Sequence, residues 1–119
     1  ENYLRGSSLN KIRESGSNFV SIEATTLRKL LEELQPTPRI LKMDCEGCEY
    51  DVILNDYETM EVFDAIIFEY HSYETGIPIN TLLIKLNNFR CVSVGESFYE
   101  KYFPDYTREE LGMIYCLKK

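Results

Sequence analysis

The sequence lacks any long apolar run. Its longest apolar stretches are short, such as Ala65–Phe68, whereas a membrane-spanning helix needs roughly 20 apolar residues. A charged segment followed by an apolar one, the pattern of a signal peptide, is also missing. We therefore expect a cytoplasmic protein with no membrane partner. A targeting signal would lie upstream if Glu1 is not the natural start.

Positive charge is scarce as well. The chain has 13 lysines and arginines against 20 aspartates and glutamates, a formal net charge of −7 over 119 residues. Nucleic acids and anionic membranes bind basic surfaces, so the composition argues against both as partners. It does not argue against a small-molecule substrate. Hydrophobic residues make up 44%, enough for the core of one small domain over residues 1–119.

The glycines are too dispersed to form a nucleotide-binding loop. No two of them stand one residue apart as in Gly-x-Gly, so the sequence shows no recognisable cradle for a cofactor. The cofactor-binding residues are therefore unknown at this point. The six glycines are Gly6, Gly16, Gly47, Gly76, Gly95 and Gly112.

The four cysteines show no regular spacing. Cys91 and Cys116 lie in apolar, strand-like runs, and reduced buried thiols are the simplest interpretation. Cys45 and Cys48 match the C-x-x-C pattern of redox and zinc sites. Acidic neighbours would destabilise a thiolate there, and zinc would need a second pair of ligands. We expect four free thiols and no zinc.

Helical and strand patterns alternate along the chain, which predicts an α/β fold. Such alternation is typical of a mostly parallel sheet with crossover helices, and here the last two strands should form an antiparallel pair. The aromatic stripe in residues 98–106 is expected to be packing surface, with a substrate lid or a subunit contact as alternatives. Predicted strands are 19–22, 40–43, 63–70, 89–94 and 111–117. Predicted helices begin after Thr25 or Thr26, at Cys48 and at Pro78, and residues 1–18 are expected to be loop.

Acidic side chains follow the predicted strand 40–43. Asp44 and Glu46 lie where that strand ends, and ligands in open α/β sheets bind beyond the carboxyl ends of the strands. The alternative is an acidic turn that caps the next helix, because carboxylates are favoured at a helix N-terminus. His71, the only histidine, ends the next strand. Its ordinary pKa near neutrality suits catalysis, although a partly exposed strand-end residue would look the same.

The residues around Asp44 resemble the signature of a known family. The string LKMDCEGCE at 41–49 resembles the Leu-Lys-Ile-Asp-Val-Glu-Gly-Ala-Glu signature of FkbM-type methyltransferases. Segments 20–31 and 66–71 resemble what precedes and follows it in that family, so the resemblance spans about 19–117. It implies the carboxyl-terminal half of a Rossmann-like class I methyltransferase sheet. It also implies S-adenosylmethionine as the cofactor and methyl transfer to a small-molecule or sugar-type hydroxyl.

The resemblance implies catalytic roles for Asp44, Glu46 and His71. Methyl transfer requires an aligned acceptor that loses its proton, so a carboxylate could be the base or could hold a divalent metal. No metal ligands are assigned from the sequence. The glycine-rich half of the family has no counterpart here, so we do not expect this chain alone to bind S-adenosylmethionine tightly. Whether it is an enzyme stays open: the alternatives are a non-catalytic, truncated Rossmann-like association module and a thiol redox or zinc protein.

The strand at residues 40–44 predicts self-association. In methyltransferases of the class that this chain resembles, the motif strand lies in mid-sheet beside the cofactor half. Without that neighbour the strand would expose unpaired backbone groups, so we expect a homodimer through the 40–44 edge. Residues 19–22 folding over the edge would be the alternative. Lys42 weighs against pairing, because a lysine protects an exposed edge.

Overall fold

The computed structural model describes residues 21–119, which form a single four-stranded sheet with helices on both faces. The strands agree closely with those predicted from the sequence, and two of them, 40–43 and 89–94, have the predicted bounds. In chain order the elements are α1 (Leu27–Leu34), β1 (Ile40–Met43), α2 (Cys48–Asn55), α3 (Tyr57–Met60), β2 (Ala65–His71), α4 (Ser72–Thr75), α5 (Ile79–Lys85), β3 (Phe89–Val94), α6 (Glu96–Tyr102) and β4 (Leu111–Lys118).

The sheet is mixed, with the strand order β1-β2-β4-β3. β1 and β2 are parallel, whereas β4 is antiparallel to both β2 and β3. The predicted antiparallel pairing of the last two strands is confirmed, but the expectation of a mostly parallel sheet is wrong. The last strand inserts between β2 and β3, so most of the pairings in the described chain are antiparallel. An apolar run reveals that a strand is buried, but it does not reveal which strands lie beside it.

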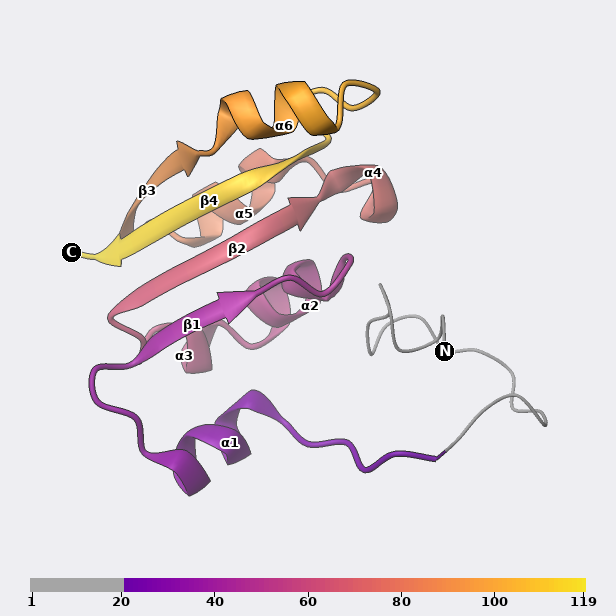
Figure 1. Cartoon of the computed structure of the whole chain (residues 1–119). Helices are drawn as coiled ribbons and strands as arrows, with labels where there is room; N and C mark the ends of the chain where they lie inside the picture. Colours follow the sequence, from indigo (N-terminus) through magenta and orange to yellow (C-terminus); the bar gives the residue numbers. More distant parts are fainter. Residues whose placement is uncertain (1–20) are drawn as a thin grey trace.

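The helices divide between the two faces of the sheet. Figure 1 shows α6 lying alone over β3 and β4, with α2, α3 and α5 on the opposite face. The hydrophobic core lies on this second face, where α2 packs on β2 and α5. None of the helices within residues 21–119 is long and apolar enough to cross a membrane. The core includes Met43, Tyr50, Ile53, Met60, Phe63, Ile66, Phe68, Leu82, Leu86, Phe89, Ile114 and Cys116.

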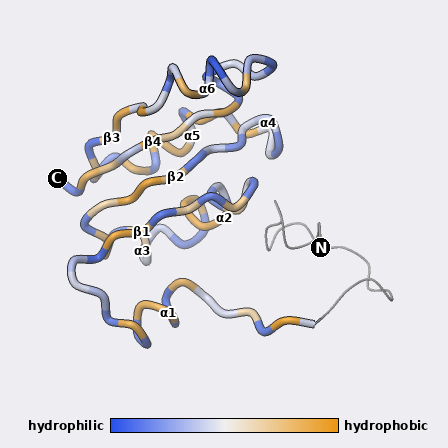
Figure 2. Tube along the Cα trace, in the orientation of Figure 1, coloured by the Kyte–Doolittle hydropathy of each residue, from blue (hydrophilic) through white to orange (hydrophobic). Residues whose placement is uncertain are grey.

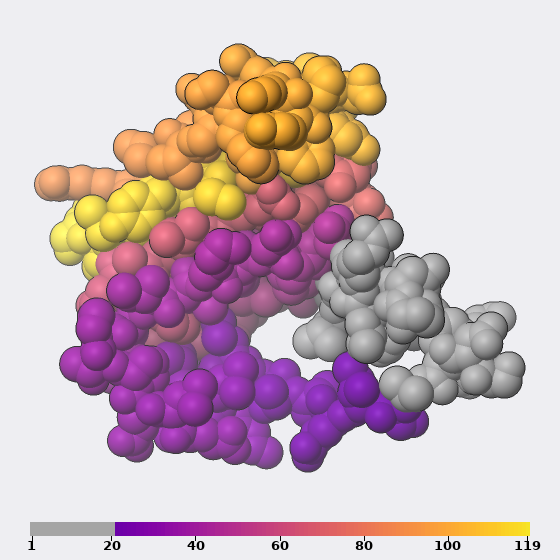
Figure 3. Space-filling model, viewed as in Figure 1, coloured from indigo at the N-terminus to yellow at the C-terminus, as the bar shows by residue number. Residues whose placement is uncertain are grey.

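Helix α1 begins where the sequence predicted but is less buried than expected. The Thr26 hydroxyl caps it by accepting a hydrogen bond from the Lys29 amide at 3.1 Å. Leu27 and Leu31 pack against the core, while Leu30 and Leu34, predicted on the same buried face, are exposed. The space-filling view places α1 and α6 at opposite ends of the molecule (Figure 3). The helix therefore packs on the core through Leu27 and Leu31.

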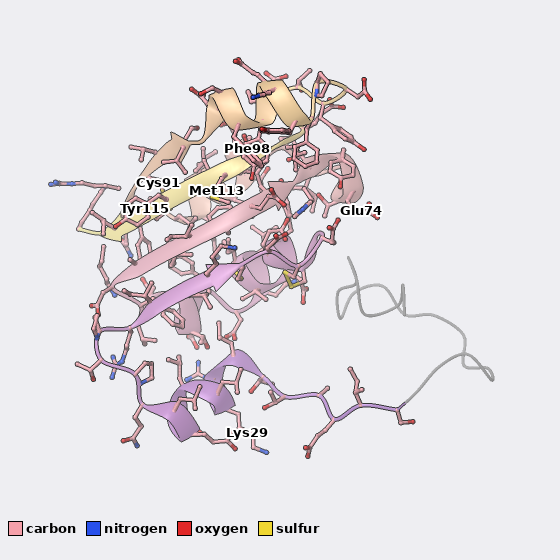
Figure 4. The ribbon with its side chains drawn as sticks, in the orientation of Figure 1. Lys29, Glu74, Cys91, Phe98, Met113 and Tyr115 are labelled. Carbon is pink, nitrogen blue, oxygen red and sulfur yellow. A yellow bond between two sulfur atoms is a disulfide. The ribbon has the colours of Figure 1, made fainter. Side chains whose placement is uncertain are left out.

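The segment before β4 contains a helix, α6, that was not among the predicted helices. Three of its aromatic residues, Phe98, Tyr99 and Tyr102, lie in α6, and Tyr99 is buried. Phe98 packs on Tyr99 and Tyr102, with ring centroids 5.3 and 5.0 Å apart. Figure 4 shows Phe98 on α6 near Met113 of β4. Of the stripe, only Tyr99 is buried, whereas Phe98, Tyr102 and Phe103 are exposed, so its interpretation as packing surface stays a prediction for these residues.

The prediction of four free thiols is wrong. Cys91 and Cys116 form a disulfide between β3 and β4, and Cys45 and Cys48 form a second one. The antiparallel register pairs Cys91 directly with Cys116 and brings their Cα atoms to 4.0 Å. These two residues are 25 positions apart, so only the strand register could have revealed their proximity.

Strand β1 lies at the edge of the sheet in the described part of the chain. It pairs with β2 alone, and Ile40 and Lys42 are exposed on it. Lys42 could be tolerated in a strand either by pairing with a carboxylate such as Asp44 or as a solvated edge residue, and its exposure on β1 agrees with the second interpretation. The predicted loop 1–18 lies outside the described residues. So do residues 19 and 20 of the segment 19–22, which was predicted as a possible substitute strand. Ser21 and Ile22 belong to no strand.

The homodimer through β1 stays a prediction that one substitution tests. Ile40→Lys adds charge to an exposed position on the free edge, so it should convert a dimer into a monomer at tens of micromolar chain. Ile84→Lys is the matched control, because Ile84 is equally apolar, is 72% exposed and lies away from β1 on α5. Light scattering measures the mass. A wild-type chain that is strictly monomeric would contradict the prediction.

Candidate functional site

The parallel pairing of β1 and β2 brings the predicted site residues together. Met43 lies opposite Phe68, so the residues that follow on each strand emerge at the same edge of the sheet. Asp44 Oδ1 lies 3.7 Å from His71 Nε2, and Glu46 Oε2 lies 3.9 Å from the same nitrogen. Figure 2 shows β2 changing from hydrophobic at its start to hydrophilic towards α4, where this cluster lies.

A tight turn connects β1 to α2 and aims Glu46 at the histidine. Glu46 and Gly47 both have left-handed backbone conformations, with φ of 56° and 113°. Gly47 tolerates this conformation, whereas in a residue with a Cβ, such as Glu46, it costs about 1 kcal/mol. The Cys45–Cys48 disulfide spans these two residues, with the Cα atoms 5.4 Å apart. The turn is therefore held in a strained form at the residues of the motif.

Glu49 is the most deeply buried ionisable side chain of the site, with 0% of the side chain exposed. One of its oxygens accepts a hydrogen bond from the Gly47 amide at 3.1 Å. The other accepts from the backbone amide of His71 at 2.9 Å and lies 3.0 Å from His71 Nδ1. A buried carboxylate requires such partners. Glu49 therefore ties the β1–α2 turn to the end of β2.

His71 is an imidazolium between two carboxylates. Its Nδ1 faces Glu49, and its Nε2 lies 3.1 Å from Glu69 Oε1. Carboxylate oxygens accept hydrogen bonds, so both ring nitrogens carry protons. Burial alone would lower the pKa of His71, but hydrogen bonds to Glu49 and Glu69 and the charges of Glu49 and Glu46 raise it to about 10. The ring is therefore charged at neutral pH.

The remaining carboxylates of the cluster have opposite pKa shifts. The hydrogen bond from His71 is the main reason that the pKa of Glu69 falls to about 2. Burial, followed by the charge of Glu69 and a hydrogen bond to it, raises the pKa of Asp44. Tyr99 of α6 donates its hydroxyl hydrogen to the second oxygen of Glu69. Of this carboxylate pair, Asp44 is thus the side chain that more readily accepts a proton and the more exposed of the two.

The arrangement has two chemical capacities. One carboxylate, Asp44, is half-exposed and has a raised pKa, which suits a general base. In addition, ligand atoms of Asp44, Glu46 and His71 all lie within 4.8 Å of one another. A divalent cation could replace the proton on Nε2, with Glu49 orienting the ring through Nδ1 as second-layer carboxylates do. The sequence alone gave no metal ligands because the fold creates this proximity.

Several open hollows lie outside the cluster in the described part of the chain. One, of about 490 Å³, separates α1 from α3 and is lined by Arg28, Leu31, Thr59 and Val62 among others. Another, of about 540 Å³, starts beside the site, because its lining includes Ser72 and Tyr73, the residues directly after His71. A smaller hollow of about 200 Å³ is lined by Gly47 among others, so it adjoins the turn that contains Glu46.

Sequence reasoning missed three members of the site. Glu49 was read only as part of the acidic motif at 41–49, Glu69 as part of a strand, and Tyr99 as packing surface. A signal existed for Glu69, because it precedes His71 by two positions and must share its face of β2. No sequence signal links Tyr99 to the site, since it reaches Glu69 from 30 residues away.

The comparisons with known proteins agree with the motif. The family model described as the methyltransferase FkbM domain matches residues 2–106, which is most of the chain. No match was found among curated proteins, and none among solved structures.

The charge on His71 predicts a specific pH dependence of stability. Its pKa is raised from 6.5 to about 10 on folding, so its stabilising contribution is complete below pH 6.5 and is lost as the pH rises to 10. His71→Gln leaves Glu49 buried without its cation and should cost about 3–5 kcal/mol at pH 6. This cost should shrink towards pH 10. Urea unfolding at pH 6, 8 and 10 measures it.

Glu49→Gln provides the reciprocal variant, because it removes the other member of the same buried pair. This variant should also flatten the pH dependence of the unfolding free energy between pH 6.5 and 10. A wild-type chain and His71→Gln with parallel pH profiles would show that the ring is neutral in the folded state and would contradict the prediction.

Proposed function

The chain belongs to the FkbM methyltransferase family, and from that premise we propose that it forms the acceptor-activating part of an S-adenosylmethionine-dependent O-methyltransferase. The observation that supports this best is the carboxylate–imidazolium cluster at the ends of β1 and β2. The α/β architecture with a mixed four-stranded sheet is consistent with a methyltransferase-like domain. The Rossmann-like arrangement and a sugar-type or small-molecule hydroxyl as acceptor are part of the proposal.

Asp44 is the proposed base that takes the proton from the acceptor hydroxyl. His71 cannot take that proton at neutral pH, because both of its nitrogens already donate to carboxylates. Asp44 has 49% of its side chain exposed, so an acceptor can reach it. In this scheme His71 positions the carboxylates, and Glu46 is the second carboxylate that faces the acceptor. The raised pKa of Asp44 brings it closer to that of an effective base.

The charge of the cluster favours a cationic methyl donor. Asp44, Glu46, Glu49 and Glu69 lie around the one imidazolium, so negative charge is in excess. S-adenosylmethionine has a positively charged sulfonium, and a negative site attracts it by the same Coulombic effect that raises the pKa of His71. The donor would supply the methyl group. These residues would supply the base and the negative electrostatic potential that orients the sulfonium.

The alternative proposal is an association module without catalysis. Within this sequence no Gly-x-Gly pair is present to hold the cofactor, and β1 offers a free edge for pairing. The cytoplasmic location also stays a prediction. The two disulfides weigh against it, because such bonds persist mainly in oxidising compartments.

Asp44→Asn tests catalysis against the association module. The amide keeps the shape but cannot act as a base, so turnover should fall at least about 100-fold, while Tm should change little because Asp44 is half-exposed. Turnover is measured as S-adenosylhomocysteine formed with a panel of sugar hydroxyl acceptors, in a chain that includes a glycine-rich cofactor segment. Asp51→Asn, exposed on α2, is the control. Equal losses of turnover and stability would favour a purely structural role.

The 119-residue chain alone should bind S-adenosylmethionine weakly or not at all. The reason is that its glycines provide no loop for close approach to the cofactor. Isothermal titration calorimetry with the isolated chain measures this directly, with S-adenosylhomocysteine as a neutral comparison. Micromolar binding would show that another part of the chain forms the cofactor site.

A further inference from the structure

A disulfide spans the turn that positions the candidate carboxylates. Cys45 and Cys48 enclose Glu46 and Gly47, and Asp44 precedes them directly. We propose that Cys45–Cys48 is a reducible disulfide and that its reduction releases Glu46 from the cluster around His71. Redox control of catalysis at this site would follow only if the proposed function is correct, so that part of the inference rests on the proposed function. The mechanism rests on the geometry of the turn.

The backbone at Glu46 supplies the driving force. Glu46 holds a left-handed φ of 56°, a conformation that residues with a Cβ rarely adopt. The cross-link between its neighbours closes the turn, and the hydrogen bond from the Cys48 amide to the Cys45 carbonyl is long at 3.4 Å. Once the sulfurs separate, the covalent restraint on the turn is lost, and only hydrogen bonds oppose relaxation of Glu46: this long one, that from the Gly47 amide to Glu49 and that from the Tyr50 amide to the Gly47 carbonyl. Its carboxylate then leaves the position 3.9 Å from His71 Nε2.

A second contact transmits the redox state to Glu49. Cys45 Sγ lies 3.5 Å from Glu49 Oε1, the oxygen that accepts from the Gly47 amide. In the disulfide this sulfur has no hydrogen to donate, whereas the reduced thiol has one. The thiol of Cys45 would then compete with Gly47 for Glu49. Reduction therefore changes a hydrogen bond of the carboxylate that holds His71.

The chemistry is a thiol–disulfide exchange with a dithiol reductant. A reductant thiolate attacks one sulfur of the Cys45–Cys48 bond and releases the other as a thiolate, which takes up a proton. The second thiolate of the reductant then attacks the reductant's own sulfur in the mixed disulfide, and the remaining protein cysteine leaves as a thiolate that takes up a proton. Cys45 and Cys48 gain two electrons and two protons in all, and the reductant becomes a cyclic disulfide. Both cysteines are half-buried and reachable, whereas Cys116 of the other disulfide is fully buried.

Graded reduction of the 119-residue chain tests the proposal. The chain is treated with increasing dithiothreitol, its thiols are alkylated, and mass spectrometry identifies which disulfide has opened. Cys45–Cys48 should open at a lower reductant concentration than Cys91–Cys116. In that state, amide exchange in residues 45–49 and at His71 should rise about tenfold as the turn relaxes. Exchange in β3 and β4 should stay unchanged.

Two double variants provide matched controls. C45S/C48S should show the faster exchange without reductant, and C91A/C116A should keep the response to dithiothreitol. If C91A/C116A does not fold, wild-type chain at partial reduction gives the same comparison. The proposal is overturned if Cys45–Cys48 resists reduction until the chain unfolds, or if its opening leaves exchange in residues 45–49 unchanged. Neither readout involves methyl transfer, so failure of the proposed function leaves this test intact.

Discussion

The site depends on one buried carboxylate. Glu49 is the side chain that joins the turn after β1 to the end of β2, through hydrogen bonds from Gly47 and from two N–H groups of His71. Removing a carboxylate from water is costly unless its oxygens are fully hydrogen-bonded and a cation is near. Here both conditions are met by groups from the turn after β1 and from the end of β2. The geometry of the cluster therefore depends on Glu49, a residue that is buried beneath it and does not face solvent.

This arrangement explains how so many carboxylates lie together. His71 is charged because Glu49 faces one nitrogen and Glu69 the other, and that single positive charge offsets part of the repulsion among the acids. Tyr99 adds a hydrogen bond to Glu69 from α6. The helix on the far side of β4 thus supports a site at the ends of β1 and β2. The pKa of Asp44 rises while that of Glu69 falls, so of these two carboxylates Asp44 takes up a proton more readily.

The sequence predicted local structure well and long-range structure poorly. The capping threonine, the bounds of β1 and β3, and the residues Asp44, Glu46 and His71 could be read from spacing and motif, because each depends on near neighbours in the chain. The position of β4 between β2 and β3 could not, since strand pairing depends on contacts that periodicity does not encode. The errors on the cysteines and on Tyr99 follow from this. Cys91–Cys116 depends on strand register, and the role of Tyr99 depends on where α6 lies over the sheet.

The two disulfides differ in what they contribute to the fold. On the chain-entropy estimate, a loop closed over 25 positions stabilises the fold by roughly 3.5 kcal/mol, and one closed over 3 positions by roughly 2 kcal/mol. Cys91–Cys116 also joins two strands that already pair in register, so its effect extends over the sheet. Cys45–Cys48 cross-links only its own turn, and that turn contains the strained Glu46. A bond with the smaller effect on global stability thus lies where local geometry matters most, because the position of Glu46 relative to His71 depends on the conformation of this turn.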